Sequence, residues 1–246
     1  MEAVDFAVSY LGAGLSVVPI RGDGSKAPTL AWKKYQSQRL KEAEAKGLFK
    51  EVEGVAIICG SISKGLEVMD FDEPSFFPRW RKAVIEMCKE TFKHRVPEDL
   101  VSSLPQVTTP SGGTHIYFQS TCCEGNLKLA WTKGDDDQYK VAIETRGEGG
   151  YVLAPGCTSL CHEDGGEYEQ VGGPPIVECP VVTDEERSIL ISAAHNLNEK
   201  DVSSLEWTAG DKASSSTGDR PGDQFNRQSN WSEILRPSGW KIIRNT

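Results

Sequence analysis

Three short segments constrain this chain more than any other feature, because each joins an apolar, strand-like run to acidic or glycine residues. In chain order they are residues 65–72 (GLEVMDFD), 109–118 (TPSGGTHIYF) and 143–155 (IETRGEGGYVLAP). Runs rich in Val, Ile, Tyr and Phe predict strands, and Gly and Pro predict the turns between them. The sequence therefore predicts a sheet of short strands whose ends carry carboxylates, a histidine and an arginine.

The remaining pattern adds helices to these strands, which predicts the α/β (α+β) class. Helices are expected at 5–13, 33–49, 77–94 and 184–196, the last with Thr183 as its N-cap. Strands are expected at 15–20, 55–59, 66–71, 107–109, 114–118, 141–145 and 151–154. Residues 122–138, which contain three consecutive aspartates, are expected to form an exposed loop or insertion. The expected sheet is mixed, with helices behind it.

The 246 residues suffice for one medium domain with an appendage. We assign residues 1–198 to that domain. Residues 199–222 shift to Ser, Gly, Asp and Thr, which is typical of a flexible linker. The segment 223–246 carries tryptophans and aliphatic residues but is too small for a core of its own. It either packs back on the domain or begins a further one.

The formal net charge of −9 argues against a protein that simply coats nucleic acid. The acidity is uneven, however. Residues 1–150 hold 19 Lys/Arg against 21 Asp/Glu, whereas residues 151–200 hold 2 against 9. A basic groove near the three segments therefore remains compatible with the composition.

The sequence shows no membrane-length apolar stretch and no basic secretory start, so we expect a cytoplasmic protein without a membrane partner.

The seven cysteines are odd in number and irregularly spaced, which argues against a disulfide framework. Cys122 and Cys123 could meet Cys157, Cys161 and His162 at a zinc ion. None of these spacings is the C-x-x-C that zinc sites favour. We prefer the interpretation that the cysteines are small buried apolar residues, and leave zinc open.

Asp70 and Asp72 stand at positions i and i+2 of a strand end, so their side chains point to one face. Two adjacent carboxylates repel each other, and a divalent cation such as Mg²⁺ or Mn²⁺ relieves that repulsion. Two alternatives stay open for this pair. The pair is equally compatible with a solvated strand end and with the D-x-D of a nucleotide-sugar glycosyltransferase.

The second segment offers Ser111, Gly112 and Gly113 directly before His115. Glycines let backbone N–H groups approach a phosphate closely, and the serine hydroxyl adds a donor. The alternative is an ordinary hairpin turn followed by a core histidine. The neighbouring acidic segments favour the functional interpretation.

The third segment offers Glu144 as a third carboxylate and Arg146 as a bidentate partner for a triphosphate. Taken by itself, this pair is as well explained by a polar strand edge with a surface ion pair. Its value lies in its combination with the other two segments.

Together the three segments resemble the archaeo-eukaryotic primase superfamily, and most closely the bifunctional DNA primase/polymerase (prim-pol) domain of phage and plasmid replication proteins. The resemblance covers residues 5–195. Residues 54–60 with 65–72 look like its first motif, 109–118 like its second and 144–155 like its third, where the acid is usually an aspartate. Residues 15–28 are similar to its N-terminal strand and basic loop.

The resemblance implies a primase-like catalytic core with an RRM-like second half, and a template-directed nucleotidyltransferase that makes primers and extends DNA by a two-metal mechanism. It implies single-stranded DNA and NTPs or dNTPs as partners, and a linked helicase in the full-length protein. The implied metal ligands are Asp70, Asp72 and Glu144, which with His115 form the catalytic set. The implied nucleotide-binding residues are Ser111, Gly112, Gly113, His115, Arg146 and Lys26.

Two rival functions remain. A non-catalytic single-stranded DNA-binding replication module would bind DNA tightly without binding nucleotides through a metal. A D-x-D glycosyltransferase would cleave a sugar nucleotide without any template, but it leaves the second and third segments unexplained.

Overall fold

The computed structural model describes residues 2–92 and 98–200, which belong to a compact unit, Met1–Val202. A second unit, Ser203–Thr246, lies outside the described residues. The predicted linker, except for its first two residues, and the predicted C-terminal segment therefore also lie outside them. Glu199 accepts hydrogen bonds from Arg79 (2.9 Å) and Thr132 (2.5 Å), so the packed structure extends into the start of that predicted linker.

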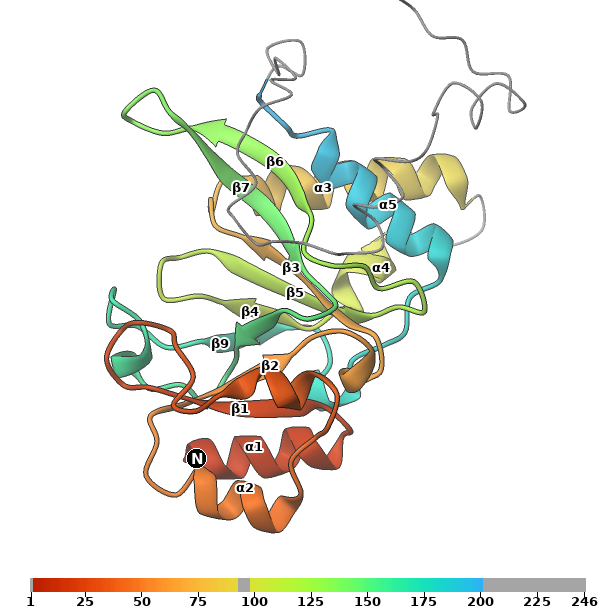
Figure 1. Ribbon diagram of the computed structural model, residues 1–246. Helices are drawn as coiled ribbons and strands as arrows, with labels where there is room; N and C mark the ends of the chain where they lie inside the picture. The colour runs from red at the N-terminus through yellow and green to blue at the C-terminus, as the bar shows by residue number, and fades with distance from the viewer. Residues whose placement is uncertain (1, 93–97, 201–246) are drawn as a thin grey trace, which may run out of the picture. The chain divides into compact units, whose positions relative to one another are not determined.

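The first of two sheets has three antiparallel strands in the order β1-β2-β8 (Figure 1). They are β1 (Ser16–Ile20), β2 (Gly54–Ile58) and β8 (Tyr151–Leu153). Every residue of β1 and β2 is buried, which explains their continuous apolar sequences. Two helices, α1 (Ala3–Gly12) and α2 (Glu42–Leu48), lie beneath this sheet in Figure 1 and share its core.

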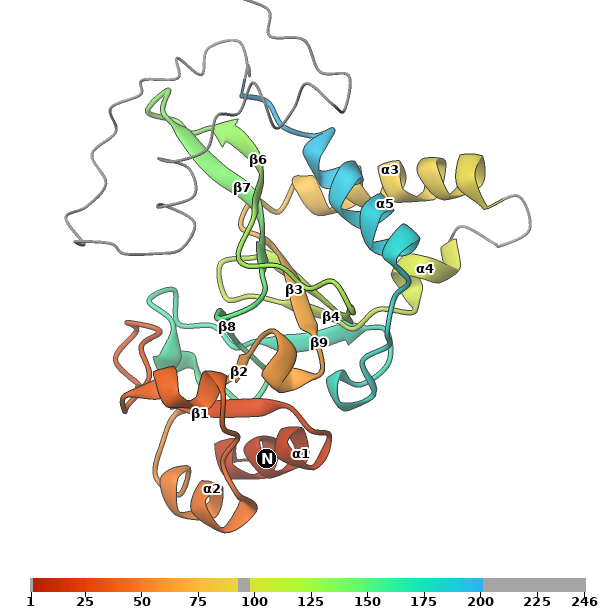
Figure 2. The ribbon, with the colours of Figure 1, turned by 45° about the vertical axis from the view of Figure 1, so that its right-hand side comes forward.

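The second sheet has six antiparallel strands in the order β6-β7-β3-β5-β4-β9. Their bounds are β3 (Leu66–Phe71), β4 (Gln106–Thr108), β5 (Thr114–Gln119), β6 (Lys128–Lys133), β7 (Tyr139–Arg146) and β9 (Glu169–Gly172). Figure 2 shows α3 (Phe76–Thr91), α4 (Glu98–Ser102) and α5 (Asp184–His195) together on one side of it. No helix in the described part of the chain is long and apolar enough to span a membrane.

Strand β3 lies between two separate hydrophobic cores. Met69 and Phe71 belong to the core shared with α3 and α5, whereas Leu66 and Val68 belong to the core of the three-stranded sheet. This division follows from the alternation of side chains along a strand. Asp70 is in register with Leu66 and Val68, so it faces the side of the three-stranded sheet and not the helices.

A buried ion pair joins α5 to the centre of the six-stranded sheet. Arg187 donates from Nε to one oxygen of Glu67 (2.7 Å) and from Nη2 to the other (2.9 Å), and Glu67 is fully buried. The expected N-cap is confirmed, because the Thr183 side chain accepts from the backbone N–H of Glu186. The ion pair holds α5 against β3, and the cap stabilises the first turn of α5.

The α/β class is confirmed, but the expected mixed sheet is not, because every pairing between the named strands is antiparallel. Short turns join β4 to β5 and β6 to β7, and such hairpins can pair strands only in opposite directions.

Two further expectations were wrong. The helix expected at 33–49 is a 3₁₀ helix, η1 (Trp32–Gln36), followed by an irregular segment and α2. Tertiary contacts hold η1 there, since Tyr35 is buried and Gln36 donates to the carbonyl of Gly149 (2.7 Å). The loop expected at 122–138 contains β6, which pairs with β7 and buries Leu129.

Candidate active site

The pairing of β3 with β7 brings three carboxylates together. Asp70 lies directly opposite Glu144, and the backbone N–H of Asp72 donates to the carbonyl of Ala142 (3.1 Å), which continues the ladder past the end of β3. Oxygens of Asp70, Asp72 and Glu144 lie within 4.8 Å of one another. In residues 2–92 and 98–200 this is the only group of three side chains that can hold a metal ion.

Two nitrogen-bearing side chains, His115 and Arg146, contact these acids. His115 on β5 lies opposite Asp70, with 3.3 Å between its Nε2 and Oδ1 of the carboxylate. Arg146 on β7 reaches the other oxygen of Asp70 (3.6 Å) and also pairs with Glu144. Burial by itself would raise the pKa of Asp70, but His115 and Arg146 lower it below its usual value.

The negative charges of the other two acids are less well balanced by nearby positive side chains. Burial, followed by the negative charges of Asp70 and Glu144, raises the pKa of Asp72 to about 6. Burial also raises the pKa of Glu144, and although Arg146 opposes this shift, Asp70 adds to it. Clustered carboxylates that resist ionisation together are a donor set that suits a divalent cation. Oxygen-only ligands of this kind fit Mg²⁺ or Mn²⁺.

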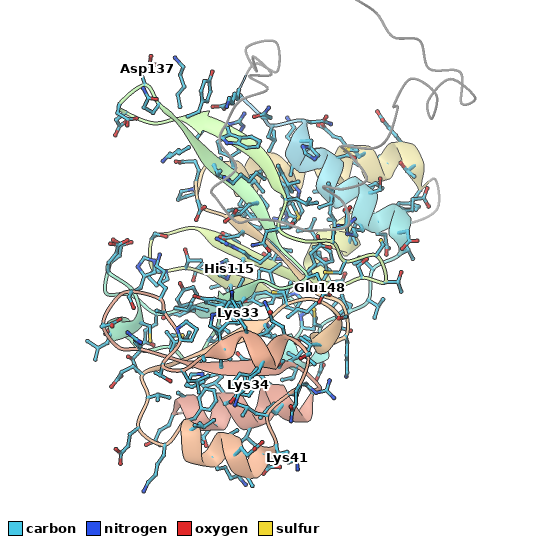
Figure 3. The ribbon with its side chains drawn as sticks, viewed as in Figure 1. Lys33, Lys34, Lys41, His115, Asp137 and Glu148 are labelled. Atoms are coloured by element: carbon cyan, nitrogen blue, oxygen red, sulfur yellow. The ribbon has the colours of Figure 1, made fainter. Side chains whose placement is uncertain are left out.

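His115 is held from both ring nitrogens. Its Nδ1 lies 3.4 Å from the hydroxyl of Tyr117, which in turn donates to the carbonyl of Leu153 (3.5 Å). The ring of Tyr168 packs beside it, with 5.7 Å between the centroids. Figure 3 shows His115 between the two sheets of the described unit. Its neighbours fix the ring with Nε2 toward Asp70.

A cavity of about 370 Å³ opens beside the acids. Of the residues predicted to bind a nucleotide, Lys26, Ser111, His115 and Arg146 line it, together with Asp70 and Asp72. Acids and cations from segments far apart in sequence therefore share one hollow. This arrangement can hold a ligand that carries both a bound cation and negative phosphates.

Gly112 and Gly113 do not line this cavity; backbone conformation explains the first glycine and close packing explains the second. Gly112 has a φ of +83°, a conformation that side chains rarely adopt. A Cβ on Gly113 would lie 2.4 Å from the carbonyl oxygen of Phe71. The glycines thus allow the β4–β5 turn, which carries Ser111, to lie against the end of β3.

Aromatic residues that the sequence did not predict to bind a nucleotide also line the cavity. Trp32 packs edge-on against Tyr151, with 4.9 Å between the centroids, and the Tyr151 hydroxyl donates to the carbonyl of Lys26 (3.2 Å). Tyr168 and His162 complete this wall. Only Tyr151 lay within one of the three segments. The others reach the cavity through tertiary packing that no local pattern reveals.

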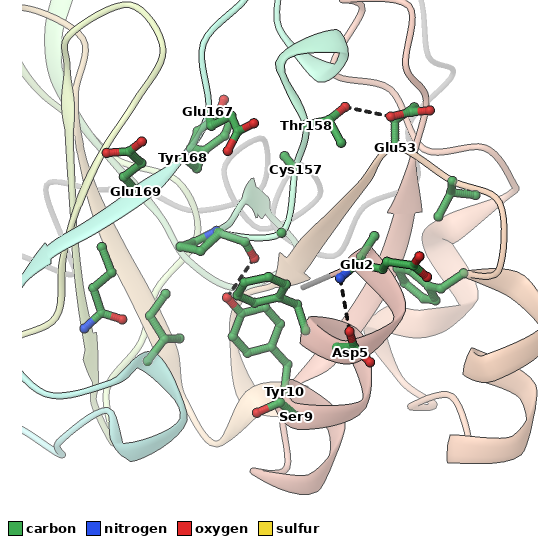
Figure 4. Close-up of a pocket in the computed structure, with 18 of the residues that line it drawn as sticks. Glu2, Asp5, Ser9, Tyr10, Glu53, Cys157, Thr158, Glu167, Tyr168 and Glu169 are labelled. Carbon is green, nitrogen blue, oxygen red and sulfur yellow. Dashed lines mark hydrogen bonds between the residues drawn. The ribbon is translucent and has the colours of Figure 1, made fainter.

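A larger hollow of about 1010 Å³ lies next to α1 (Figure 4). Carboxylates dominate its polar lining: Glu2, Asp5, Glu51, Glu53, Glu167 and Glu169. They would repel a triphosphate, and among the described residues they supply no group of three metal-binding side chains. The smaller cavity is therefore the candidate site, despite its size.

The cysteines proposed for zinc are all free thiols. Cys157 and Cys161 pack closely against β2, where a Cβ on Gly54 would lie within 2.8 Å of both sulfurs. Within the described ranges, no metal-binding group of three includes Cys122, Cys123, Cys157 or Cys161. His162 instead lines the candidate cavity.

Comparison with known proteins gives one family. The family model described as "Bifunctional DNA primase/polymerase, N-terminal" (Prim-Pol) matches residues 7–182. No curated protein matches the chain. The matched range contains every named strand of both sheets, and with them all three clustered acids.

Proposed function

This chain belongs to the bifunctional DNA primase/polymerase family, and we propose that it joins nucleotides on a single-stranded DNA template, both to make primers and to extend DNA. The family is one of primase/polymerase-type nucleotidyltransferases. One observation of the structure carries the proposal to this chain. Asp70, Asp72 and Glu144 lie within 4.8 Å of one another, beside a cavity that Lys26 and Arg146 line.

The three acids would hold two divalent cations, Mg²⁺ or Mn²⁺. When bound, these cations would lower the pKa of the attacking 3′-hydroxyl and neutralise charge on the triphosphate. The acids supply oxygen ligands from two adjacent strands, so their spacing depends on the β3–β7 register and not on a flexible loop. Glu144 reaches further than an aspartate would at this position.

Other residues would bind and orient the nucleotide. Arg146 now pairs with Asp70 and Glu144, and on nucleotide binding it would exchange these carboxylates for phosphate oxygens. Lys26 and the hydroxyl of Ser111 add donors from two separate loops. His115 would act as a positioning residue that keeps the Asp70 carboxylate turned toward the cations.

Primer extension with Asp70→Ala tests the proposal. In Mn²⁺ or Mg²⁺, the unsubstituted protein should extend a primer on a DNA template, and the variant should fall to background while keeping a cooperative thermal transition. Glu90→Gln serves as the matched control, because Glu90 is an exposed acid on α3 and should leave extension unchanged. Extension that survives Asp70→Ala would contradict the proposal.

The biological setting is part of the same proposal. We place the activity in the cytoplasm, in the replication of a phage, plasmid or other mobile element, with a helicase linked in the full-length protein. The resemblance of the three segments to such replication proteins supports this setting. Tight binding of single-stranded DNA without any nucleotide incorporation would favour a DNA-binding module instead.

A further inference from the structure

His162 lies in the candidate cavity although it belongs to none of the three acidic or glycine-rich segments. It directly follows the short 3₁₀ helix η3 (Ser159–Cys161), in the loop after β8, and lines the same hollow as Asp70 and Arg146. Its side chain is 3 % exposed. A titratable ring this deeply buried inside a polar cavity requires an explanation.

The contacts of His162 identify which nitrogen carries its proton. The backbone N–H of Asp164 donates to Nδ1 at 3.1 Å, and the Asp164 carboxylate lies further from the same nitrogen, at 3.4 Å. A backbone N–H can only donate, so Nδ1 accepts and the proton of the neutral ring is on Nε2. In the described part of the chain, no residue accepts a hydrogen bond from Nε2. The ring thus keeps an Nε2–H donor, on a residue that lines the cavity, from which no described residue accepts.

Lys26 is held beside this histidine by backbone contacts. Ser25 forms a β-bridge with His162, and the N–H of Gly24 donates to the carbonyl of Leu160 (2.9 Å). Lys26 itself has a φ of +58°, which is uncommon for a residue other than glycine, and its carbonyl accepts from Tyr151. These contacts set the basic loop against the loop of His162, so a cation and a neutral donor enter the cavity side by side.

The two donors stand apart from the acids. Between His162 and His115, which contacts Asp70, lies the ring of Tyr168, at centroid distances of 6.3 Å and 5.7 Å. Burial, and then the nearby charge of Lys26, lower the pKa of His162, which keeps the ring neutral near pH 7. One aromatic ring therefore separates His162 from His115. This separation suits a triphosphate that places its reacting phosphate at the acids and its terminal phosphate at His162.

We propose that His162 is a nucleotide-binding residue that donates its Nε2–H to the terminal phosphates of the incoming triphosphate, beside Lys26. This inference rests on the proposed function, since it takes a nucleoside triphosphate as the substrate. An ammonium group next to a neutral N–H donor is an arrangement for phosphate oxygens. Through this hydrogen bond, His162 would select nucleoside triphosphates over nucleotides that carry fewer phosphates.

Direct binding of ATP, dATP and dAMP in the presence of Mn²⁺ tests this assignment. His162→Ala should weaken binding of the triphosphates about 10-fold or more, the usual effect of losing one hydrogen bond to a charged group. Binding of dAMP should change little. Inorganic tripolyphosphate should compete with dATP on the unsubstituted protein and compete more weakly on the variant. Equal weakening of dATP and dAMP would overturn the assignment.

Four further variants complete the test. His162→Gln retains an N–H donor and should recover part of the triphosphate affinity, which also covers the case in which His162→Ala fails to fold. Lys26→Ala should lose triphosphate affinity as well, and the double variant should lose less than the two single losses combined, because the two donors bind the same phosphates. His195→Ala, at an exposed histidine of α5, is the matched control and should bind dATP normally.

The outcomes separate this assignment from the proposed function. If the unsubstituted protein binds neither ATP nor dATP, both fail. If it binds them and His162→Ala binds them equally well, only the assignment of His162 fails. If His162→Ala shows the selective loss but the unsubstituted protein incorporates no nucleotide on a template, the proposed function fails and the triphosphate site stands.

Discussion

Of the three acids in the site, Asp72 has the fewest ion pairs to offset its negative charge. Asp70 pairs with His115 and Arg146, and Glu144 pairs with Arg146, whereas Asp72 makes no ion pair with any described residue. Its raised pKa of about 6 reflects this imbalance. The residues that make the site fit a cation therefore also make the cation-free protein less stable.

Asp72→Asn should stabilise the protein when no divalent cation is present. The pKa of Asp72 is higher in the folded state, at about 6, than its ordinary value of 3.8. Between these values the folded state binds more protons, so the free energy of unfolding falls as pH rises through this window. With a chelator present, the variant should melt above the unsubstituted protein near pH 8, and the difference should vanish near pH 4. A variant that melts lower at both pH values would contradict this account.

Mn²⁺ should raise the melting temperature of the unsubstituted protein near pH 8. Carboxylates must lose their protons to bind a metal, so this rise should shrink as pH falls through about 6, where Asp72 is protonated. Ligand at 100-fold its Kd adds about 2.7 kcal/mol of stability. The rise should be lost in Asp72→Asn and kept in Glu90→Gln. An equal rise in both variants would place the cation elsewhere.

At the scale of elements, β3 connects the acids to the helix layer through the buried pair of Glu67 and Arg187. Arg187→Met should lower the free energy of unfolding by about 3–5 kcal/mol, because it leaves a fully buried carboxylate without its partner. Urea unfolding measures this loss. The double variant with Glu67→Gln should recover most of it. A double variant as unstable as Arg187→Met would show that packing, and not the unpaired charge, causes the loss.

The turn between β4 and β5 should tolerate no side chain at Gly113. Gly113→Ala places a Cβ 2.4 Å from the Phe71 carbonyl oxygen, and such overpacking costs about 1–3 kcal/mol. Gly47→Ala is the contrasting control, since nothing lies within 4 Å there and alanine is the better helix former within α2. Thermal unfolding should show a decrease for the first variant and none for the second. Equal melting temperatures would contradict the close packing of this turn.

How much could be predicted from sequence also differs between elements. The alternation in 65–72 predicts that Asp70 and Asp72 point to one side, and in the structure oxygens of both lie within 4.8 Å of each other, because strand geometry is local. Residues 33–49 look helical by composition, but contacts of Tyr35 and Gln36 with distant residues hold η1 instead. Likewise β6 depends on pairing with β7, which its own short sequence does not reveal. In both segments, contacts with residues distant in sequence determine which structure forms.

For the whole described unit, the candidate site depends on both sheets. The six-stranded sheet supplies the acids and Arg146, whereas the loops of the three-stranded sheet supply Lys26 and His162. The six-stranded sheet thus carries the cation ligands together with one phosphate donor, and the loops of the three-stranded sheet add further donors. The sequence could list most of these parts, but their convergence follows from strand registers between distant segments and from the packing of one sheet beside the other.

The most direct test of the central claim is synthesis without a primer. The unsubstituted protein is incubated with single-stranded DNA of defined sequence, labelled NTPs or dNTPs, and Mn²⁺ or Mg²⁺. We expect labelled oligonucleotides complementary to the template, which disappear when the cation or the template is left out and when Asp70 is replaced by alanine. The absence of product from the unsubstituted protein under all these conditions, or equal product from Asp70→Ala, would contradict it.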